Sequence, residues 1–445
     1  MDDLTKRGRF QYLPWIICGL GALFYFYAYL LRVVPSVIAP QLLITYRLDA
    51  VSLSNLAGIY YYVYMPMQII VGLLLDRFNP RILLASALVA CGFGNFLFAN
   101  SESLLLAYVG RVFVGLGSAF AFIGVLKMAC IYLPIYRFAF ITGAITSFGM
   151  LGGIIGNTLL TSLVNYQGWR LANYSIATFG VLVGLGMLLM ENRELRNLRV
   201  FVPTLKEVLR GLLALLCKRQ IWVNCTVGCL LFIPLVGFAD FWGVSYLVGV
   251  YHLSPLTAAE GISLIYLGWF CGALFVGWIS DSLKSRRMPL TVGATFSAIL
   301  LSVILYVPNL THELLFLSLF FLGLFGSAQV IVFSVSRELS PHPLTATAIA
   351  LTNTVVTFSG VSLSLIGVLL NLSWSDYAIN RISFYAWNYQ LALGILPLSL
   401  IVAVFLTFYL EDTNCKRVTL AIFTINGVVH DYLLFIFKFW ACRAI

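Results

Sequence analysis

The stretch GLLLDRFNPR, residues 72–81, decides the fold because the chain carries a second copy of it. Its Gly72, Asp76 and Arg81 recur as Gly277, Asp281 and Arg286 in GWISDSLKSR, 205 positions further on. Further pairs recur at the same or slightly larger spacings: Tyr46-Arg-Leu48 with Tyr251-His-Leu253, Gly117-Ser-Ala119 with Gly326-Ser-Ala328, and Gly149 and Gly156 with Gly360 and Gly367. A repeat of this length predicts a chain built from two similar halves.

The composition is that of a membrane protein. The chain has 445 residues, of which 61% are hydrophobic and only 10% charged, whereas soluble chains are about 25% charged. A helix needs about 20 apolar residues to cross the hydrocarbon core. Twelve windows meet this requirement: 13–40, 52–75, 82–100, 103–130, 138–164, 169–190, 219–250, 257–280, 289–308, 312–338, 344–371 and 383–410. The runs are continuous and do not alternate as strands of a membrane barrel do.

We therefore predict an all-α membrane protein with 12 transmembrane helices in two pseudo-symmetric six-helix halves. The polar stretches divide the chain into an N-terminal half over 1–190, a cytoplasmic linker over 191–218, a C-terminal half over 219–412 and a tail over 413–445. Six crossings return the chain to the side on which it began, so the halves are parallel repeats about an axis along the membrane normal.

The net charge of +10 is explained by membrane topology. If the N-terminus is cytoplasmic, nearly all loop arginines and lysines lie inside, and only Arg47, Arg170 and Arg381 lie outside. This positive-inside bias predicts an inner-membrane protein with both termini in the cytoplasm, whose partner is the lipid bilayer and not nucleic acid. The nine cysteines and four histidines have no metal-binding spacing, so we expect neither a metal nor a cofactor, and we see no catalytic constellation of an enzyme.

Three ionisable residues lie deep within predicted spans: Arg32, Arg111 and Asp240. Such residues are costly in lipid and are candidates for function. Asp240 aligns with Pro35 across the repeat, so we expect Arg32 and Asp240 at similar depth on opposite sides of the pseudo-axis. They would clamp the carboxylate and ammonium of an amino acid, pair with each other until a proton neutralises Asp240, or form a static ion pair.

The second span presents a polar face. Tyr60, Tyr64, Gln68 and Gly72 recur every four residues, so they drift only slowly around one side of a helix. Tyr60 to Tyr62 also fit an aromatic belt at the membrane interface. In the second half, Gln329 and Asn353 are polar residues in mid-span that would complete a substrate site, or would instead bond neighbouring helices together.

The motif G-x-x-x-D-R-x-x-x-R at 72–81, its weaker copy, and Arg111-x-x-x-Gly115-x-Gly117 resemble signature motifs of the major facilitator superfamily. More narrowly, FYFYAYLLRVVPSVIAPQL (24–42), YYYVYMPMQIIVGLLLDRFNPR (60–81) and LEDTNC (410–415) look like the phagosomal nutrient transporter (Pht) family of intracellular bacteria. The resemblance implies the superfamily fold and a secondary active transporter that works by alternating access as a functional monomer.

The resemblance also implies roles for single residues. Asp76 would lie near the start of a helix in the opposite half, where the helix dipole stabilises a carboxylate, and Gly72 would allow close helix approach. The predicted cytoplasmic gate comprises Gly72, Asp76, Arg77, Arg81, Gly277, Asp281 and Arg286. The alternative is that these charges are simply solvated. Arg32 stands where carriers of anions place an arginine, Tyr64 and Gln68 would face the central cavity, and Arg111 matches a residue linked to proton coupling.

From these residues we predict uptake of a small polar nutrient such as an amino acid, coupled to protons. The predicted substrate contacts are Arg32, Tyr64, Gln68, Asp240, Gln329 and Asn353, and the predicted proton-coupling residues are Asp240 and Arg111. The alternatives are symport of a nucleoside or an organic anion, and proton-driven efflux. The stretch GMLGGIIG (149–156) lacks the proline of the corresponding motif in drug/proton antiporters, which weighs against efflux.

Overall fold

The computed structural model describes residues 2–132, 138–189, 212–213, 215–340, 344–372 and 386–415, with only the backbone given for 2–17, 76–77, 129–132, 138–144 and 346. Within these residues, twelve helices are long and apolar enough to cross a membrane. The prediction of twelve spans is therefore confirmed. Much of the predicted linker 191–218 and most of the tail 413–445 lie outside the described residues.

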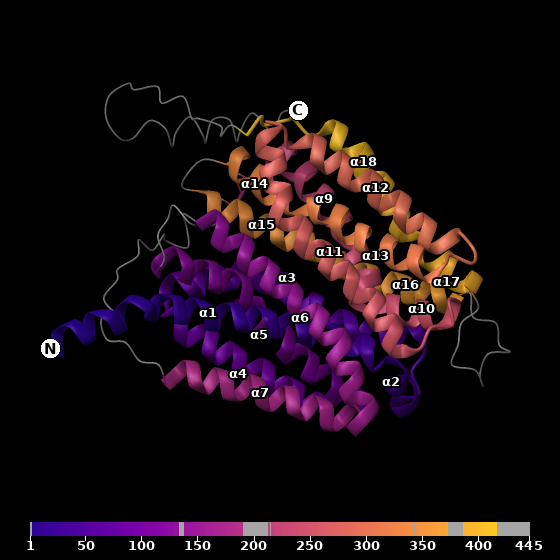
Figure 1. Ribbon diagram of the computed structural model, residues 1–445, viewed down its shortest axis with the longest axis horizontal. Coiled ribbons are helices and arrows are strands. Elements are labelled where there is room, and N and C mark those ends of the chain that lie inside the picture. Colours follow the sequence, from indigo (N-terminus) through magenta and orange to yellow (C-terminus); the bar gives the residue numbers. More distant parts are fainter. Residues whose placement is uncertain are drawn as a thin grey trace.

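The first six spans form one bundle, drawn in indigo to magenta in Figure 1. Its elements are α1 (Asp2–Val37), α2 (Ala39–Tyr46), α3 (Ala50–Arg77), α4 (Pro80–Ala99), α5 (Leu104–Tyr132), α6 (Phe138–Gln167) and α7 (Trp169–Leu189). Helix α4 packs against α5 and α7, and α1 packs against α5 and α6. The short helix α2 follows the first span at the end of the bundle farthest from the N-terminus (Figure 1).

The last six spans form the second bundle, in which several helices are interrupted. Its elements are α9 (Arg219–Pro234), η3 (Leu235–Trp242), α10 (Gly243–Val250), α11 (Pro255–Ser282), α12 (Arg287–Tyr306), α13 (His312–Gly326), η4 (Ser327–Val330), α14 (Ile331–Leu339), α15 (Thr345–Thr357), η6 (Phe358–Gly360), α16 (Val361–Leu372), α17 (Ala386–Leu393) and α18 (Ile395–Tyr409). α9, η3 and α10 together make span 7, α13 to α14 make span 10, and α15 to α16 make span 11.

The repeat seen in the sequence is also a repeat of local structure. Asp49 caps α3 by accepting a hydrogen bond from the Ser52 amide at 2.9 Å, and Ser254 caps α11 by accepting one from the Thr257 amide at 3.1 Å. Each side-chain oxygen satisfies a backbone N–H that has no partner in the first turn of a helix. Just before these caps, Arg47 and His252 both adopt a left-handed backbone, with φ of 52° and 53°. The two copies therefore enter their second helix through the same turn.

Span 7 departs from regular α-helix at its centre. Pro234 lacks an amide hydrogen and so cannot continue the normal hydrogen-bond ladder. The next eight residues, Leu235–Trp242, form the π-helix η3 before Gly243 resumes the α-helix. A Cβ at Gly243 would lie 2.6 Å from the Phe238 carbonyl oxygen, so only glycine fits there. π-helices are rare, and they concentrate at functional sites.

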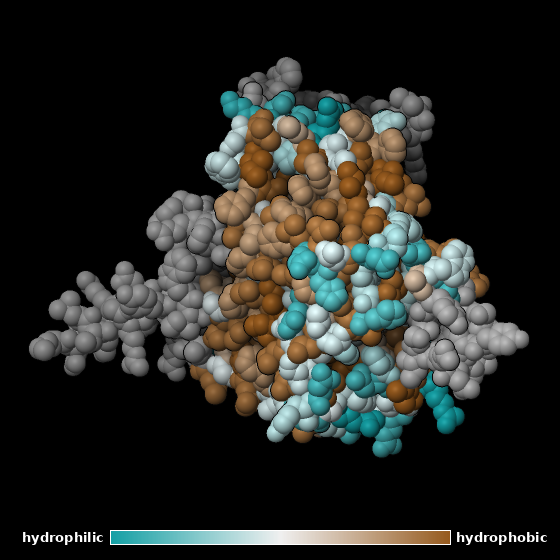
Figure 2. Space-filling view, turned by 45° about the vertical axis from the view of Figure 1, so that its right-hand side comes forward, coloured by the Kyte–Doolittle hydropathy of each residue, from teal (hydrophilic) through white to brown (hydrophobic). Residues whose placement is uncertain are grey.

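The outside of the bundle is suited to lipid. Large hydrophobic side chains such as Leu105, Leu182, Phe275 and Trp278 are more than half exposed. Figure 2 shows hydrophobic residues covering the middle of one face, with hydrophilic residues gathered at the upper end and at the lower right. Burial in a bilayer satisfies such a surface, because the apolar groups are removed from water.

The two bundles meet through α3 with α15 and α16, and through α6 with α11. The polar contacts on α3 run from its start to its middle: Ser364 donates to Asn55 at 2.6 Å, and Asn353 donates to Gln68 at 2.9 Å. One turn beyond Gln68, a Cβ at Gly72 would have no neighbour within 4 Å. The halves are thus in contact at the end that carries α2 and α10, which we call the closed end, while Gly72 faces open space further along α3.

Candidate functional site

The centre of the interface holds the cation of Arg32. Helix α1 carries it, and its side chain is only 4% exposed. Its guanidinium carbon lies 4.1 Å from the centre of the Tyr29 ring and 5.5 Å from the rings of both Tyr60 and Tyr61. Aromatic faces attract a cation through their quadrupole, so the rings stabilise the buried charge without neutralising it.

Asp240 lies opposite Arg32, as the repeat alignment predicted. Arg32 Nη1 and Asp240 Oδ2 are 4.0 Å apart, which is too long for a hydrogen bond. The hydroxyl of Tyr61 donates to Oδ2, and the hydroxyl of Tyr266 donates to Oδ1. The carboxylate is therefore held by two tyrosines, one from each half, and faces the arginine without a direct bond.

Two hydrogen-bond donors of Arg32 are not used by the protein residues that the structure describes. Its Nε and Nη1 are buried and have no protein acceptor among the described residues. A buried donor left without an acceptor costs about 1–3 kcal/mol, and more when it is charged. Since charge-assisted bonds from a guanidinium N–H to a carboxylate or a similar acid group are strong, either of these donors is suited to the acid group of a solute.

The predicted polar residues from the two halves meet directly. Gln68 Oε1 accepts from Asn353 Nδ2 at 2.9 Å, and both side chains are buried. Tyr64 stacks on Tyr60 with ring centres 5.6 Å apart. These residues line the same part of the interface as Arg32, whose guanidinium is 5.9 Å from the Tyr64 ring. Gln329 is buried in η4, which packs against α11 and α12 within the second half.

Arg111 is a second buried cation near Arg32. It reaches across from α5, donates from Nη1 to the Leu31 carbonyl oxygen at 2.9 Å, and lies 5.4 Å from the Tyr60 ring. The Tyr60 ring thus faces both arginines. The described ion pairs do not include Arg111, so its part in proton coupling stays a prediction.

Two of the three tyrosines for which an aromatic belt is the alternative lie elsewhere. Tyr60 and Tyr61 are 0% and 3% exposed and belong to the buried centre, whereas Tyr62 is 38% exposed. The belt interpretation is therefore wrong for Tyr60 and Tyr61. The signal that could have identified Tyr61 is its repeat partner, since Tyr266 stands 205 positions later.

The predicted gate is described in part. The side chains of Asp76 and Arg77 lie outside the described residues. Gly72 and Gly277 both face open space, so in this conformation neither lies at a close helix approach. Arg81 lies in the first turn of α4, where its amide donates to the Asn79 cap at 3.0 Å.

The second copy of the gate is tied within its own half. Arg286 is paired with Asp281 at 2.8 Å and with Glu338 of α14 at 2.7 Å. Burial alone would lower the pKa of Arg286, but the hydrogen bonds and charge of Glu338 outweigh it and raise that pKa. Among the described residues, the ion pair of Asp281 thus lies within its own half. Glu338 was missed at the sequence level, although its place near the end of an apolar span was a signal.

Asp412 completes this cluster. It accepts from the Ser285 hydroxyl and from the Arg286 amide at 2.9 Å. Partial burial opposes ionisation, but these hydrogen bonds dominate and hold the pKa of Asp412 below its ordinary value. The cluster thus fastens the end of α18 to the loop between α11 and α12.

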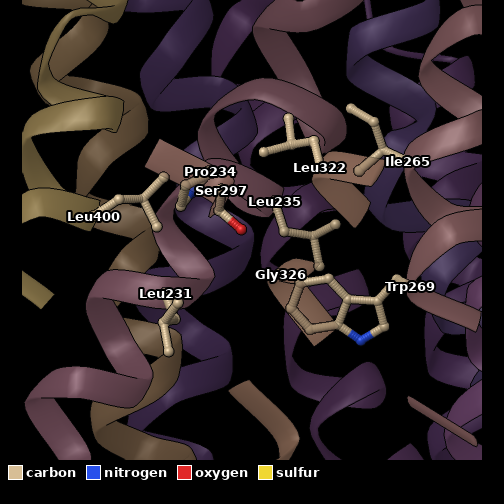
Figure 3. A pocket seen from close by; sticks show the side chains of 9 residues that line it. All are labelled: Leu231, Pro234, Leu235, Ile265, Trp269, Ser297, Leu322, Gly326 and Leu400. Carbon is tan, nitrogen blue, oxygen red and sulfur yellow. The ribbon is translucent and has the colours of Figure 1, made fainter. Parts of the chain in front are cut away.

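A small cavity lies behind the site, inside the second half (Figure 3). Its volume is about 10 Å³ and its lining is apolar except for Ser297 and Trp269. The hydroxyl of Ser297 points into it (Figure 3) and has no described acceptor. A space of this size suits a single water at most, so this cavity is not the substrate site.

Twelve spans in two halves, meeting at a buried arginine, aspartate and tyrosines, define a membrane transporter. The chain belongs to the Major Facilitator Superfamily, whose sequence model matches residues 21–364. The uncharacterized transporter YybO of Bacillus subtilis is 25% identical over 435 residues, which cover 92% of this chain and 95% of YybO. The probable sulfoacetate transporter SauU of Cupriavidus necator is 28% identical over 339 residues, or 69% of this chain and 77% of SauU.

A solved structure has the same fold. The bacterial homologue of the human lysosomal transporter Spinster, in an inward-facing and unoccupied conformation, matches with a TM-score of 0.73 at 15% identity. The match covers 92% of this chain and 99% of that one. The family and the fold are therefore established at the level of the superfamily, and the narrower resemblance to the Pht transporters stays a prediction.

Proposed function

We propose that this protein couples uptake of a small solute bearing an acid group to the entry of a proton, with Arg32 binding the acid group and Asp240 carrying the proton. The observation that best supports this proposal is that the two charged side chains differ in their hydrogen bonds. Asp240 is held by two tyrosine hydroxyls, while Nε and Nη1 of Arg32 are buried without a protein acceptor.

The coupling follows from charge. An acid group on Arg32 would bring a second negative charge close to Asp240, since Arg32 Nη1 is only 4.0 Å from Asp240 Oδ2. Arg32 can neutralise only one of these negative charges, and Arg111 donates to the Leu31 carbonyl oxygen, so keeping both acid groups ionised in this buried site is unfavourable. A proton on Asp240 removes the conflict, so solute and proton favour each other's binding.

The acid group narrows the substrate class. An amino acid, as predicted from the sequence, and an organic anion both carry one, whereas a nucleoside does not. The probable sulfoacetate transporter among the relatives supports an acidic solute. An amino acid would in addition need an acceptor for its ammonium group, and Asp240 already accepts from Tyr61 and Tyr266.

The proposed orientation places both termini in the cytoplasm of a cell with an inner membrane. The closed end then faces outward, and the structure is the inward-facing state of a carrier that works as a monomer. The positive-inside bias and the match to an inward-facing structure support this assignment.

The test is uptake into proteoliposomes under an imposed pH gradient, with radiolabelled amino acids, small sulfonates and carboxylates, and nucleosides. We expect an outside-acidic gradient to drive accumulation of one acid-bearing solute, and Asp240→Asn to leave only exchange. Asp49→Asn is the matched control, because asparagine caps a helix as aspartate does. Accumulation of a nucleoside, or outward movement of preloaded solute against the gradient, would contradict the proposal.

A further inference from the structure

Tyr61 and Tyr266 are repeat counterparts that converge on one carboxylate. They stand 205 positions apart and occupy the same place in α3 and α11, each twelve residues after the helix cap. Tyr61 donates to Oδ2 of Asp240 and Tyr266 to Oδ1. The N-terminal half has Pro35 where the C-terminal half has Asp240, so this symmetric pair shares a single, asymmetric acceptor.

The hydrogen bonds from the two tyrosine hydroxyls to Asp240 differ in whether they cross between the halves. Asp240 and Tyr266 both belong to the second half, so the Tyr266 bond is internal to that half. Tyr61 belongs to the first half, so its bond crosses the interface. Each ring is also seated on a glycine of the opposite half: a Cβ at Gly360 would overlap Tyr61, and a Cβ at Gly153 would lie 2.6 Å from the Tyr266 ring. Ring packing is thus matched, and only the hydroxyl bonds differ.

We propose that the Tyr61–Asp240 bond is the mid-membrane tie that holds the closed end shut, and that neutralising Asp240 releases it, whereas Tyr266 only positions the carboxylate. An ionised carboxylate accepts from both hydroxyls at full strength. A protonated one keeps a single strong acceptor oxygen, because the other becomes a hydroxyl. Oδ2 accepts the hydrogen bond from Tyr61 and is also the oxygen that lies 4.0 Å from Arg32 Nη1. The oxygen closest to the cation is therefore the one that forms the tie.

The groups that face Asp240 are few. Among the described residues they are Arg32 and Tyr29 of α1, Tyr61 of α3 and Tyr266 of α11. Segments α16 and η6, which also pack against η3, carry no charged side chain. A solute that draws Arg32 toward its acid group therefore leaves Asp240 without its only nearby cation. A proton on Oδ2 turns that oxygen into a hydroxyl, which accepts from Tyr61 only weakly, so the tie is weakened while the phenolic hydrogen stays on the tyrosine. In the direction of uptake, the tie forms again when the proton leaves Asp240.

This inference deepens the proposed function and rests on it for the source of the proton. Its test needs no transport. Hydrogen–deuterium exchange of the full-length protein in detergent measures opening of the closed end through the first turns of α3 and through α16. We expect Tyr61→Phe and Asp240→Asn each to speed exchange there by roughly tenfold, with no further gain in the double variant. Tyr266→Phe, which removes the same oxygen from the same carboxylate but breaks no bond between the halves, should speed exchange there much less than Tyr61→Phe does.

A second control tests whether the effect is specific to the Tyr61–Asp240 bond or would follow from the loss of any hydrogen bond between the halves. Tyr62 and Ser364 are joined across the same interface by a hydroxyl bond of 2.5 Å. Tyr62→Phe should add to the effect of Asp240→Asn, because it acts independently of the carboxylate. After correction for intrinsic exchange, lowering the pH should open the closed end of the wild type and not of Asp240→Asn.

Equal effects of Tyr61→Phe and Tyr266→Phe, or no effect of Tyr61→Phe, would overturn the tie. If Tyr61→Phe does not fold, Asp240→Asn alone decides, since an unchanged closed end in that variant refutes control by the carboxylate. If instead exchange behaves as expected but uptake ignores the pH gradient, the tie stands and the proposed proton coupling falls.

Discussion

The two halves share their scaffold and differ in their charges. Both enter the second helix of the half through a left-handed residue, Arg47 or His252, and an oxygen cap, and both place a tyrosine at the centre of that helix. Their first helices diverge: α1 is continuous and carries Arg32, while span 7 contains the π-helix η3 and carries Asp240. The repeated scaffold brings the halves together, and the chemistry of the site arises where the copies no longer match.

The π-helix explains why Asp240 and not the strict counterpart of Arg32 faces the interface. That counterpart is Gly237, and a Cβ there would lie 2.9 Å from Leu396 and 3.0 Å from Ile366. Gly237 therefore faces the interior of the second half. A wider helical turn changes which side chains point to the interface, and here it presents the carboxylate.

The largest effect is expected from removing the cation. Arg32→Gln should lower the initial uptake rate about 100-fold or more, because truncating one member of a buried charged pair leaves the other uncompensated. Adding Gly237→Arg should not restore uptake, since that position has no room for a side chain. Rescue by Gly237→Arg would show that the arginine can be supplied by either half, and would contradict the view that the two halves differ in the charges they can carry.

The next effect concerns the cluster found in the second half. Glu338→Gln should lower the unfolding free energy by about 3 kcal/mol, because it leaves Arg286 buried with a weaker partner. Asp281→Asn should cost under about 1 kcal/mol, since the Asp281 side chain is 65% exposed against 10% for Glu338. Thermal unfolding in detergent compares them. A larger loss for Asp281→Asn would mean that the exposed copy of the motif holds this end together.

A smaller effect is expected from pH at Asp412. Its pKa is depressed in the folded protein, so its stabilising contribution is full above the ordinary carboxyl pKa of about 3.9 and is lost as the pH falls through the lower, folded value. The midpoint of thermal unfolding should therefore decline more steeply below about pH 4 in the wild type than in Asp412→Asn. Parallel curves for the two proteins would contradict this role.

The smallest effect is expected at Gly72 and Gly277, the matched glycines of the predicted gate. Both face open space here, so Gly72→Ala and Gly277→Ala should change thermal stability by less than about 0.5 kcal/mol. If the gate closes on Gly72 in another conformation, Gly72→Ala should still slow uptake. Normal uptake by both variants would remove the close-approach role predicted for Gly72.

The sequence predicted the spans and the repeat well, and the side-chain contacts between helices less well. The spans and the repeat could be read directly, because a bilayer demands long apolar runs and because the spacing of 205 positions is plain in the chain. The approach of Arg32 to Asp240 also followed from the alignment. The belt alternative is wrong for Tyr61, and the local sequence gives Glu338 no role, since the partner of each lies on a different helix far away in the sequence.

What the sequence by itself determined is what depends on local composition: twelve apolar helices, two copies of one unit, and a few charges that lipid would not accept alone. Only the tertiary structure decided which side of span 7 faces Arg32, which tyrosines hold Asp240, and at which end the halves are closed. These depend on helix register and on packing between segments some 180 to 300 residues apart, as in Tyr61 with Asp240 and Tyr62 with Ser364. No local pattern specifies such contacts, because they form only when both halves have folded and their surfaces meet.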